Sequence, residues 1–337
     1  MFYLCTPIFI PNLVEKETIY ILAIESSCDD TSAAVLCNDK VISNVVATQK
    51  IHEEYGGVVP ELASRAHQQN IVPVVHQALL KANIDKKQLS AIAFTRGPGL
   101  MGSLLVGTSF AKSIALGLDI PLIEVNHMQA HILAHFISEG NNTKPEFPFL
   151  AMTISGGHTQ IVKVNNYFNM EILGETLDDA VGEAFDKSGK TLGLPYPGGP
   201  LVDKYAELGD SKKFPFPKPK VGDLNFSFSG LKTSILYFVQ RETKKNPKFV
   251  EENLYDICAS IQYTIINILM DKLKKAVKQT GIKQVAIGGG VSANSGIRSA
   301  LKNAEKNYGW KQAMVLSSTM EKKLEKDMEG NGLTRTN

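Results

Sequence analysis

Two stretches, ILAIESSCDDTSAAVL at residues 21–36 and FLAMTISGGHTQIVKV at residues 149–164, share one pattern: an apolar run, a short polar or glycine-containing turn, and a second apolar run. This pattern predicts two consecutive strands joined by a tight turn. Further along each half, AIAFTRGPGLMG at 91–102 and QVAIGGGVSANSG at 284–296 predict a strand that enters a helix through a Gly-rich junction. We therefore predict an α/β fold made of two copies of one unit, which face each other across a central cleft lined by the Gly-rich turns.

The segments around these repeats alternate between strand and helix patterns. Residues 40–49 form a third apolar run, so the first copy is expected to open with three strands. Apolar residues at helical spacing predict a helix over 60–83, and the run at 91–95 predicts the next strand. A helix over 104–118, a strand at 121–127 and a helix carrying three histidines are expected to follow. Such alternation is typical of α/β proteins.

Four segments follow from this pattern. They are an N-terminal extension (1–18), a first subdomain with a histidine-bearing helix (19–140), a second subdomain with substrate-binding and basic insertions (141–302), and a tail (303–337). The extension carries no Lys or Arg before its apolar stretch and makes a poor secretory signal.

Composition excludes several classes of protein. With 43% hydrophobic and 21% charged residues among 337, the chain is neither disordered nor a coiled coil. Its net charge of +2 offers no general attraction for nucleic acid, although residues 211–283 hold 14 basic and 6 acidic side chains and could contact a phosphate backbone, or simply form a solvated surface. The four cysteines form no CxxC pair, and the apolar stretch at 102–118 is too short to span a bilayer. We expect a cytoplasmic protein without a membrane segment.

A histidine pair is the first candidate for chemistry. His127 and His131 are four residues apart on a predicted helix, so one face presents both imidazoles at a spacing that suits a single metal ion. His135 extends the stripe. No HExxH motif is present, so a metalloprotease is disfavoured. Ordinary helix-surface histidines are the alternative, and a metal would need a further ligand from elsewhere.

The Gly-rich turns are candidates for binding phosphate. GPGLMG at 97–102 matches GxGxxG, with Asp119 as a ribose partner, which leaves open a dinucleotide site or a tight packing turn. Together with this motif, the turns at 155–159, 196–200 and 288–294 exceed what plain loops require. They favour a mononucleotide or adenylate ligand.

Acidic side chains cluster in two places. One short stretch contains Asp178, Asp179, Glu183, Asp186 and Asp203, of which Asp179, Glu183 and Asp186 are expected on one helical face. Asp186 and Asp203 are candidates for binding hydroxyl groups of a ribose or substrate. The alternative is a solvated acidic face whose charge is balanced by Lys187 and Lys190. In the first hairpin turn, Glu25 and Asp29 are candidate catalytic carboxylates, although turn chemistry alone would also explain the aspartate.

Taken in order, these motifs identify a family. Between Ile21 and Leu301 the chain contains IESSCDDT, GGVVPELASRAH, RGPGLMGSLLVG, NHMQAHILAH, SGGHTQ, DDAVGEAFDK, YPGGP, FSFSGLKT and GGGVSAN. In this it resembles the tRNA N6-adenosine threonylcarbamoyltransferase family, TsaD in bacteria, formerly labelled O-sialoglycoprotein endopeptidase. The resemblance implies a duplicated actin-like ATPase (RNase H-like) fold.

The resemblance also implies a reaction and its partners. The threonylcarbamoyl group of threonylcarbamoyl-adenylate is transferred to N6 of the adenosine next to the anticodon in tRNAs that read ANN codons. Family members act with a paralogous partner, TsaB, and a small ATPase, TsaE. One divalent metal, Fe2+ or Zn2+, is expected on the histidines matching His127 and His131. The residues matching those that hold the adenylate or an ATP-like or AMP-like nucleotide are Thr153, Ile154, Ser155, Gly156, Gly157, Asp186, Gly199, Asp203 and Asn294.

The chain departs from the family after GGGVSANSGIRSALK. The family continues into a T-D-N-A-A motif whose Asp is the third metal ligand, but residues 303–337 contain no TDN. A frameshift would produce such a tail, and Asp327 is the candidate substitute ligand. The resulting alternatives are a catalytically impaired scaffold of the same complex, or an actin-like kinase or ATPase.

Overall fold

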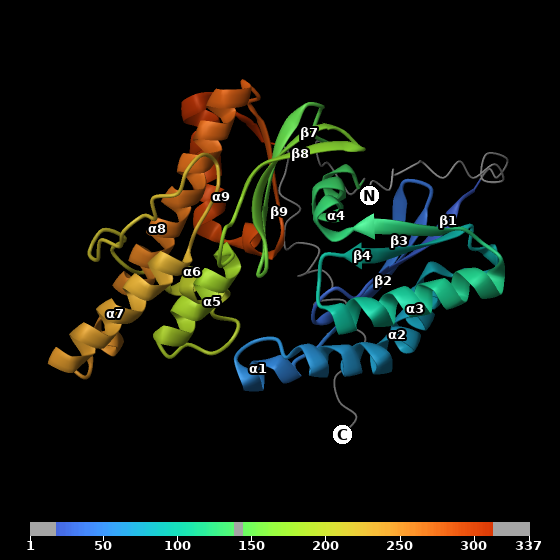
Figure 1. Ribbon diagram of the computed structural model, residues 1–337, viewed down its shortest axis with the longest axis horizontal. Coiled ribbons are helices and arrows are strands. Elements are labelled where there is room, and N and C mark those ends of the chain that lie inside the picture. The colour runs from blue at the N-terminus through green and yellow to red at the C-terminus, as the bar shows by residue number, and fades with distance from the viewer. Residues whose placement is uncertain (1–17, 138–143, 313–337) are drawn as a thin grey trace. The chain divides into compact units, whose positions relative to one another are not determined.

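The protein is described by a computed structural model that covers residues 18–137 and 144–312 (Figure 1). The chain divides into two compact units. The first contains the described residues up to Ala130 together with Ile137, and the second contains His131–Phe136 and the described residues from 144 onward.

The first unit is built on a five-stranded sheet with the order β3-β2-β1-β4-β5. β1, β2 and β3 form an antiparallel meander, and β4 and β5 continue the sheet parallel to β1. The strands are β1 (Tyr20–Glu25), β2 (Asp30–Cys37), β3 (Lys40–Thr48), β4 (Ala91–Gly97) and β5 (Leu122–Asn126). The helices are α1 (Ile51–Tyr55), α2 (Pro60–Ala82), η1 (Lys86–Gln88) and α3 (Met101–Leu118). α4 (His127–Leu133) begins in this unit and continues into the second, which contains η2 (Ala134–Phe136).

Helices α2 and α3 lie side by side against this sheet (Figure 1). α2 begins with Pro60 in its first turn, a position where the missing N–H costs no hydrogen bond. It ends at Asn83, whose φ of 53° is the left-handed conformation that stops a helix. Apolar side chains of α2, such as Ile71 and Val75, pack on Leu22 and Ile92 of the sheet to form the core of the unit.

Within the described ranges, α3 alone is long and apolar enough to cross a membrane, judged by length and composition. Its inner face, which includes Leu104, Ala111 and Ala115, is buried in the first unit, while Leu105 and Leu116 are exposed. Core helices pass the same test, so this helix is weak evidence for a membrane segment.

The second unit repeats the topology with larger insertions. Its sheet has the order β10-β9-β6-β7-β8, again an antiparallel meander (β6, β7, β8) continued by two parallel strands. The strands are β6 (Phe149–Ile154), β7 (Thr159–Asn166), β8 (Asn169–Glu175), β9 (Gln284–Gly288) and β10 (Lys311–Gln312). The helices are α5 (Val181–Thr191), α6 (Gly198–Ala206), α7 (Ser229–Lys245), α8 (Phe249–Thr280) and α9 (Ser295–Tyr308), with η3 (Gly290–Ala293) between β9 and α9.

The predicted duplication is confirmed by this correspondence. β1 to β5 of the first sheet match β6 to β10 of the second in order and direction. The two hairpin turns even have equal length, since four residues separate β1 from β2 and four separate β6 from β7. All six residues of β6 are buried, which explains why FLAMTI reads as a continuous apolar run.

Candidate active site

In the first unit, α4 begins directly at the end of β5. The Asn126 side chain caps it, because Oδ1 accepts hydrogen bonds from the backbone N–H groups of Met128 (2.9 Å) and Gln129 (3.1 Å). The first residue of the helix, His127, then points Nδ1 toward the β1–β2 turn. This nitrogen lies 3.2 Å from Glu25 Oε2 and 3.3 Å from Ser27 Oγ.

The Glu25 carboxylate is held by several donors. Thr95 on β4 donates its hydroxyl to Oε2 (2.5 Å), and the backbone N–H of Ser27 donates to Oε1. Burial alone would raise the pKa of Glu25, but the hydrogen bond and charge of His127, with the hydrogen bonds of Ser27 and Thr95, lower it to about 2. Glu25 is therefore ionised at neutral pH, which makes it a weak proton acceptor. Its contacts are those of a group that orients His127, and Asp29 lies half-buried in the same turn.

The β1–β2 turn is clamped by its surroundings. The buried His67 of α2 places Nε2 3.0 Å from the Cys28 carbonyl oxygen, to which Ser103 Oγ also donates (3.1 Å). The N–H of Leu100 donates to the Ser27 carbonyl oxygen at 2.7 Å. A Cβ on Gly99 would lie 2.5 Å from that same oxygen, so this glycine of GPGLMG is required by close packing.

Asp119, the expected ribose partner of a dinucleotide, also has a structural explanation. Asp119 ends α3 in the left-handed conformation, with φ of 52°. Because Asp tolerates this conformation at a helix C-terminus, its place twenty residues after Gly99 needs no ribose.

Helix α4 carries His127 and His131 one turn apart, as the spacing predicts. Among residues 18–137 and 144–312, no group of three or more His, Cys, Asp or Glu side chains is arranged to hold a metal ion. The predicted metal site would therefore need an oxygen or nitrogen ligand from elsewhere in addition to the two imidazoles. The candidate Asp327 lies outside the described residues.

The expectation that His135 extends the metal-binding stripe is wrong. His135 lies in η2 and is buried, with its ring nitrogens 2.9 Å and 3.1 Å from the carbonyl oxygens of Ile132 and Ile287. Burial lowers its pKa. The side chain thus joins η2 to β9 in the core of the second unit, because α4 ends before this residue and turns its ring inward.

The end of β6 and the β6–β7 turn of the second unit contain the predicted adenylate-binding residues Thr153 to Gly157. The turn packs on the start of α5: the N–H of Gly182 donates to the Ser155 carbonyl oxygen (3.1 Å), and a Cβ on Gly182 would lie 2.6 Å from that oxygen. By contrast, a Cβ on Gly156 or Gly157 would meet no other described atom within 4 Å, and neither residue has a positive φ. Packing and backbone conformation therefore do not require these two glycines, whereas close approach of a ligand would.

The other predicted adenylate-binding residues gather at helix N-termini of the second unit. Asp186 accepts a hydrogen bond from the N–H of Gly199 in the first turn of α6 (3.0 Å), and burial raises its pKa. Asp203 accepts from both the N–H and the hydroxyl of Ser295, each at 2.8 Å, in the first turn of α9. Asn294 caps α9 by accepting from the Ile297 N–H (3.0 Å).

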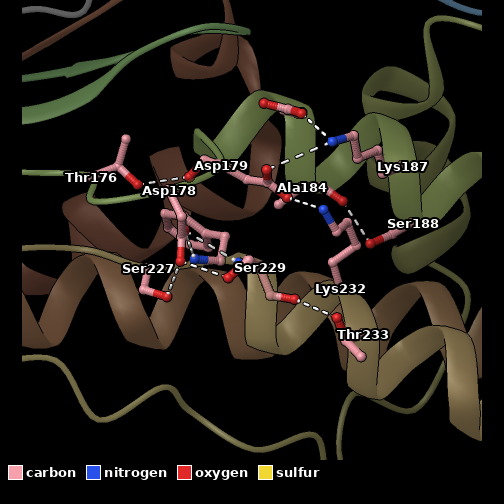
Figure 2. Close-up of polar contacts among 12 residues, drawn as sticks. Thr176, Asp178, Asp179, Ala184, Lys187, Ser188, Ser227, Ser229, Lys232 and Thr233 are labelled. Carbon is pink, nitrogen blue, oxygen red and sulfur yellow. Dashed lines mark hydrogen bonds and ion pairs between the residues drawn. The ribbon is translucent and has the colours of Figure 1, made fainter.

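Two carboxylates before and within α5, those of Asp179 and Glu183, form ion pairs with lysines (Figure 2). Asp179 forms ion pairs with Lys232 and, at 3.6 Å, with Lys187, which also pairs with Glu183. Because α5 begins at Val181, Asp179 precedes the helix, and the expectation of one helical face for Asp179, Glu183 and Asp186 is wrong. The alternative is confirmed only for Lys187, and the second lysine that pairs with Asp179 is Lys232 and not the expected Lys190.

Asp178 has a separate role that the sequence pattern did not reveal. Its carboxylate accepts from the hydroxyls of Ser227 and Ser229 and from the N–H groups of Phe228 and Ser229, at the start of α7 (Figure 2). The two serines that flank a phenylalanine directly before an apolar helix are the signal that could have indicated this cap.

The basic segment is partly neutralised within the second unit. Lys213 pairs with Asp256 and Lys218 with Asp271, each at 2.6 Å. Arg241 pairs with Glu242. The positive charge available to a polyanion is therefore smaller than the count of basic residues over 211–283 suggests.

Comparisons with known proteins agree with this picture. A family model described as "TsaD: tRNA N6-adenosine threonylcarbamoyltransferase" matches residues 40–318. A tRNA N6-adenosine threonylcarbamoyltransferase of Christiangramia forsetii is 80% identical over 298 residues, which cover 88% of each chain. One of Riemerella anatipestifer is 63% identical over 290 residues, covering 86% of this chain and 85% of the relative.

Solved structures give the same fold at much lower identity. Full-length HypF in its phosphate- and nucleotide-bound form superposes with a TM-score of 0.55 at 15% identity, covering 90% of this chain and 53% of that protein. HypF of T. kodakarensis gives a TM-score of 0.54 at 15% identity, covering 89% and 45%. Together with the repeated sheet topology, these likenesses confirm the predicted duplicated actin-like ATPase fold.

Proposed function

This chain belongs to the tRNA N6-adenosine threonylcarbamoyltransferase family, whose members are acyltransferases, and we propose on that premise that it takes its acyl group from threonylcarbamoyl-adenylate. The acceptor is N6 of the adenosine next to the anticodon in tRNAs that read ANN codons. The observation that carries the proposal is the 80% identity to a relative over 88% of both chains.

The adenylate would bind in the second unit, at the end of β6 (Thr153 and Ile154) and the turn that follows it (Ser155, Gly156 and Gly157). The open space beside Gly156 and Gly157 admits a ligand close to the backbone, where amide groups can bind a phosphate. Preorganised N–H donors of this kind stabilise the charge that develops on the departing AMP phosphate.

The other adenylate-binding residues divide into two roles. Asp186 uses one carboxylate oxygen for Gly199, which leaves the second to accept from a ligand hydroxyl. Asp203 uses both oxygens for Ser295, so it positions the start of α9 and with it Asn294. This arrangement favours Asp186 over Asp203 as the group that contacts the ligand.

His127 and His131 would hold one divalent ion, Fe2+ or Zn2+. The donor set fits such an ion in two respects: both imidazoles belong to one helix at i, i+4 spacing, and a carboxylate engages Nδ1 of His127. When bound, the ion would act as a Lewis acid toward the carbamoyl carbonyl group. The other steps belong to the chain itself: α4 presents the ligands, and the β6–β7 turn holds the leaving group.

Three macromolecular partners follow from the proposed reaction. tRNA is the acceptor, and the unpaired part of the basic segment over 211–283 would contact its phosphates. The paralogous partner TsaB and the ATPase TsaE would complete the complex, in the cytoplasm. A second candidate function, a catalytically impaired scaffold of that complex, is favoured by one observation, the lack of a TDN motif in the sequence.

Reconstitution tests the transferase proposal. The purified chain would be incubated with Fe2+ or Zn2+, threonylcarbamoyl-adenylate, TsaB, TsaE and unmodified tRNA, and the tRNA nucleosides would be analysed by mass spectrometry. Threonylcarbamoyladenosine should form with the parent chain and with the control Glu124→Gln, an exposed change in the same unit, and should be lost with His127→Ala. Formation of the complex without any modified nucleoside would support the scaffold instead.

A further inference from the structure

The carboxylate of Glu25 is fixed from three sides, and one of its partners is a predicted metal ligand. β4 supplies the Thr95 hydroxyl, the hairpin turn supplies the Ser27 N–H, and α4 supplies Nδ1 of His127. The Glu25 side chain is one-third exposed and that of His127 about one-quarter, so both are partly shielded from water. A contact in this setting is worth more than one on an open surface.

The Glu25 carboxylate determines which ring nitrogen of His127 carries the proton. A carboxylate has only acceptor atoms, so the 3.2 Å contact with Nδ1 is a hydrogen bond when Nδ1 is the protonated nitrogen. In a neutral imidazole the lone pair then lies on Nε2, at the opposite edge of the ring. A metal-ligating histidine is commonly oriented in this way by a carboxylate.

The matching position of the second unit shows that the fold itself does not need a carboxylate. Glu25 ends β1, pairs with Ser32 and precedes a four-residue turn. The antiparallel pairs place Thr153 of β6 at the same register, because it pairs with Gln160 as Glu25 pairs with Ser32, and its side chain is buried. An uncharged residue thus serves the same place in the same topology, so a carboxylate at Glu25 has a local purpose.

We propose that Glu25 is a positioning residue, which fixes the tautomer and ring orientation of His127 so that Nε2 becomes the metal-binding atom. The proposal replaces the expectation that Glu25 acts directly on the substrate, and it rests on the proposed function only for the identity of the ligand as a metal. The hydroxyl of Thr95 donates a hydrogen bond to Glu25 and so helps to fix the orientation of its carboxylate.

The first test measures the tautomer without any metal. Long-range proton–nitrogen NMR spectra of the metal-free full chain, labelled in its histidine rings, report which nitrogen of His127 is protonated. The parent chain should carry the proton on Nδ1. In Glu25→Gln the single amide oxygen is needed by the Ser27 N–H, which leaves the NH2 group facing His127, so the proton should move to Nε2.

The second test measures metal affinity with Zn2+ as the probe, by competition with a chelator. Glu25→Gln should weaken Zn2+ binding about 10- to 100-fold, the usual effect of removing an outer-shell partner. Glu124→Gln, which removes a carboxylate paired with Arg96 in the same unit, is the matched control and should leave affinity and tautomer unchanged. If Glu25→Gln fails to fold, Glu25→Ala, which removes the carboxylate altogether, should shift both measurements in the same direction.

Three results separate the possible failures. An unchanged tautomer in Glu25→Gln, or unchanged Zn2+ affinity with a folded variant, would overturn the positioning role. A parent chain that binds no Zn2+ but keeps its proton on Nδ1, with the shift in the variant, would count against the proposed metal centre and still support the hold of Glu25 on His127.

Discussion

Replacing Asp178 by alanine should destabilise the second unit in a pH-dependent manner. The Asp178 carboxylate accepts four hydrogen bonds at the start of α7: 2.5 Å from Ser227 Oγ, 2.6 Å from Ser229 Oγ, 2.8 Å from the Phe228 N–H and 3.3 Å from the Ser229 N–H. The variant leaves all four donors without this acceptor.

The magnitude follows from capping energetics. Loss of a side-chain cap costs about 0.5–2 kcal/mol, and bonds to a charged group reach about 1.5–3 kcal/mol each when they are shielded. Asp178 is exposed, so water can replace the lost acceptor and the sum must be discounted strongly. We expect a loss of about 1–2 kcal/mol in the free energy of unfolding, or about 2–8 °C in Tm for a unit of this size.

The pH dependence gives the sharper test. Partial burial works to raise the pKa of Asp178, but the hydrogen bonds from Ser227 and Ser229 and from the backbone lower it below its ordinary value of 3.8. A carboxyl with a depressed folded-state pKa stabilises the protein above its unfolded pKa, and this contribution is lost as the pH falls through the folded value. The difference between parent and Asp178→Ala should therefore be full at pH 7 and shrink below about pH 4.

Urea denaturation between pH 7 and pH 3.5 measures this difference. Asp39→Ala, which removes an aspartate from the exposed β2–β3 turn, is the matched control and should have little effect. The reasoning would be refuted by an Asp178→Ala variant as stable as the control at pH 7, or by a deficit that stays constant down to pH 3.5.

Three further predictions concern the second unit. Gly182→Ala should lower the free energy of unfolding by about 1–3 kcal/mol and raise KM for the adenylate, because the new Cβ would lie 2.6 Å from the Ser155 carbonyl oxygen. The control Gly230→Ala, at an open position, should change neither value in the same denaturation and kinetic assays. Asp203→Ala should lose about 1.5–3 kcal/mol and raise KM for the adenylate more than it lowers kcat, as steady-state kinetics would show. Phe185→Ala, at a fully buried position, should cost about 3–5 kcal/mol in urea denaturation.

Much of the fold could be predicted because its local signals agree. The meander over 20–48 appears as three apolar runs separated by turn residues, and the Gly-rich junctions after β4 and β9 appear as strands that lead into helices. The sequence-based predictions were wrong for residues that lie just outside the ends of a helix. Asp179 precedes α5 by two residues, and His135 follows the end of α4, so helical spacing no longer applies to either.

The sequence indicates candidate site residues one at a time, but it does not indicate the contacts between them. Glu25 and His127 are 102 residues apart, and no local pattern links them. Their contact follows from topology: β4 lies between β1 and β5 in a parallel arrangement, so the carboxyl ends of the three strands meet at one edge of the sheet. Side-chain patterns locate such residues, and only the strand order brings them together.

The duplicated frame explains why equivalent turns perform different tasks. In both units a glycine of the strand-to-helix junction approaches the hairpin backbone too closely for a side chain: Gly99 against Ser27, and Gly289 against Ile154. This shared packing holds each turn in place at the carboxyl ends of its sheet. What differs is the residue at the matching register position, a carboxylate at Glu25 and a buried hydroxyl at Thr153. The first contacts a histidine, while the second precedes a turn with open space beside Gly156 and Gly157, so one scaffold places different chemical groups at equivalent strand ends.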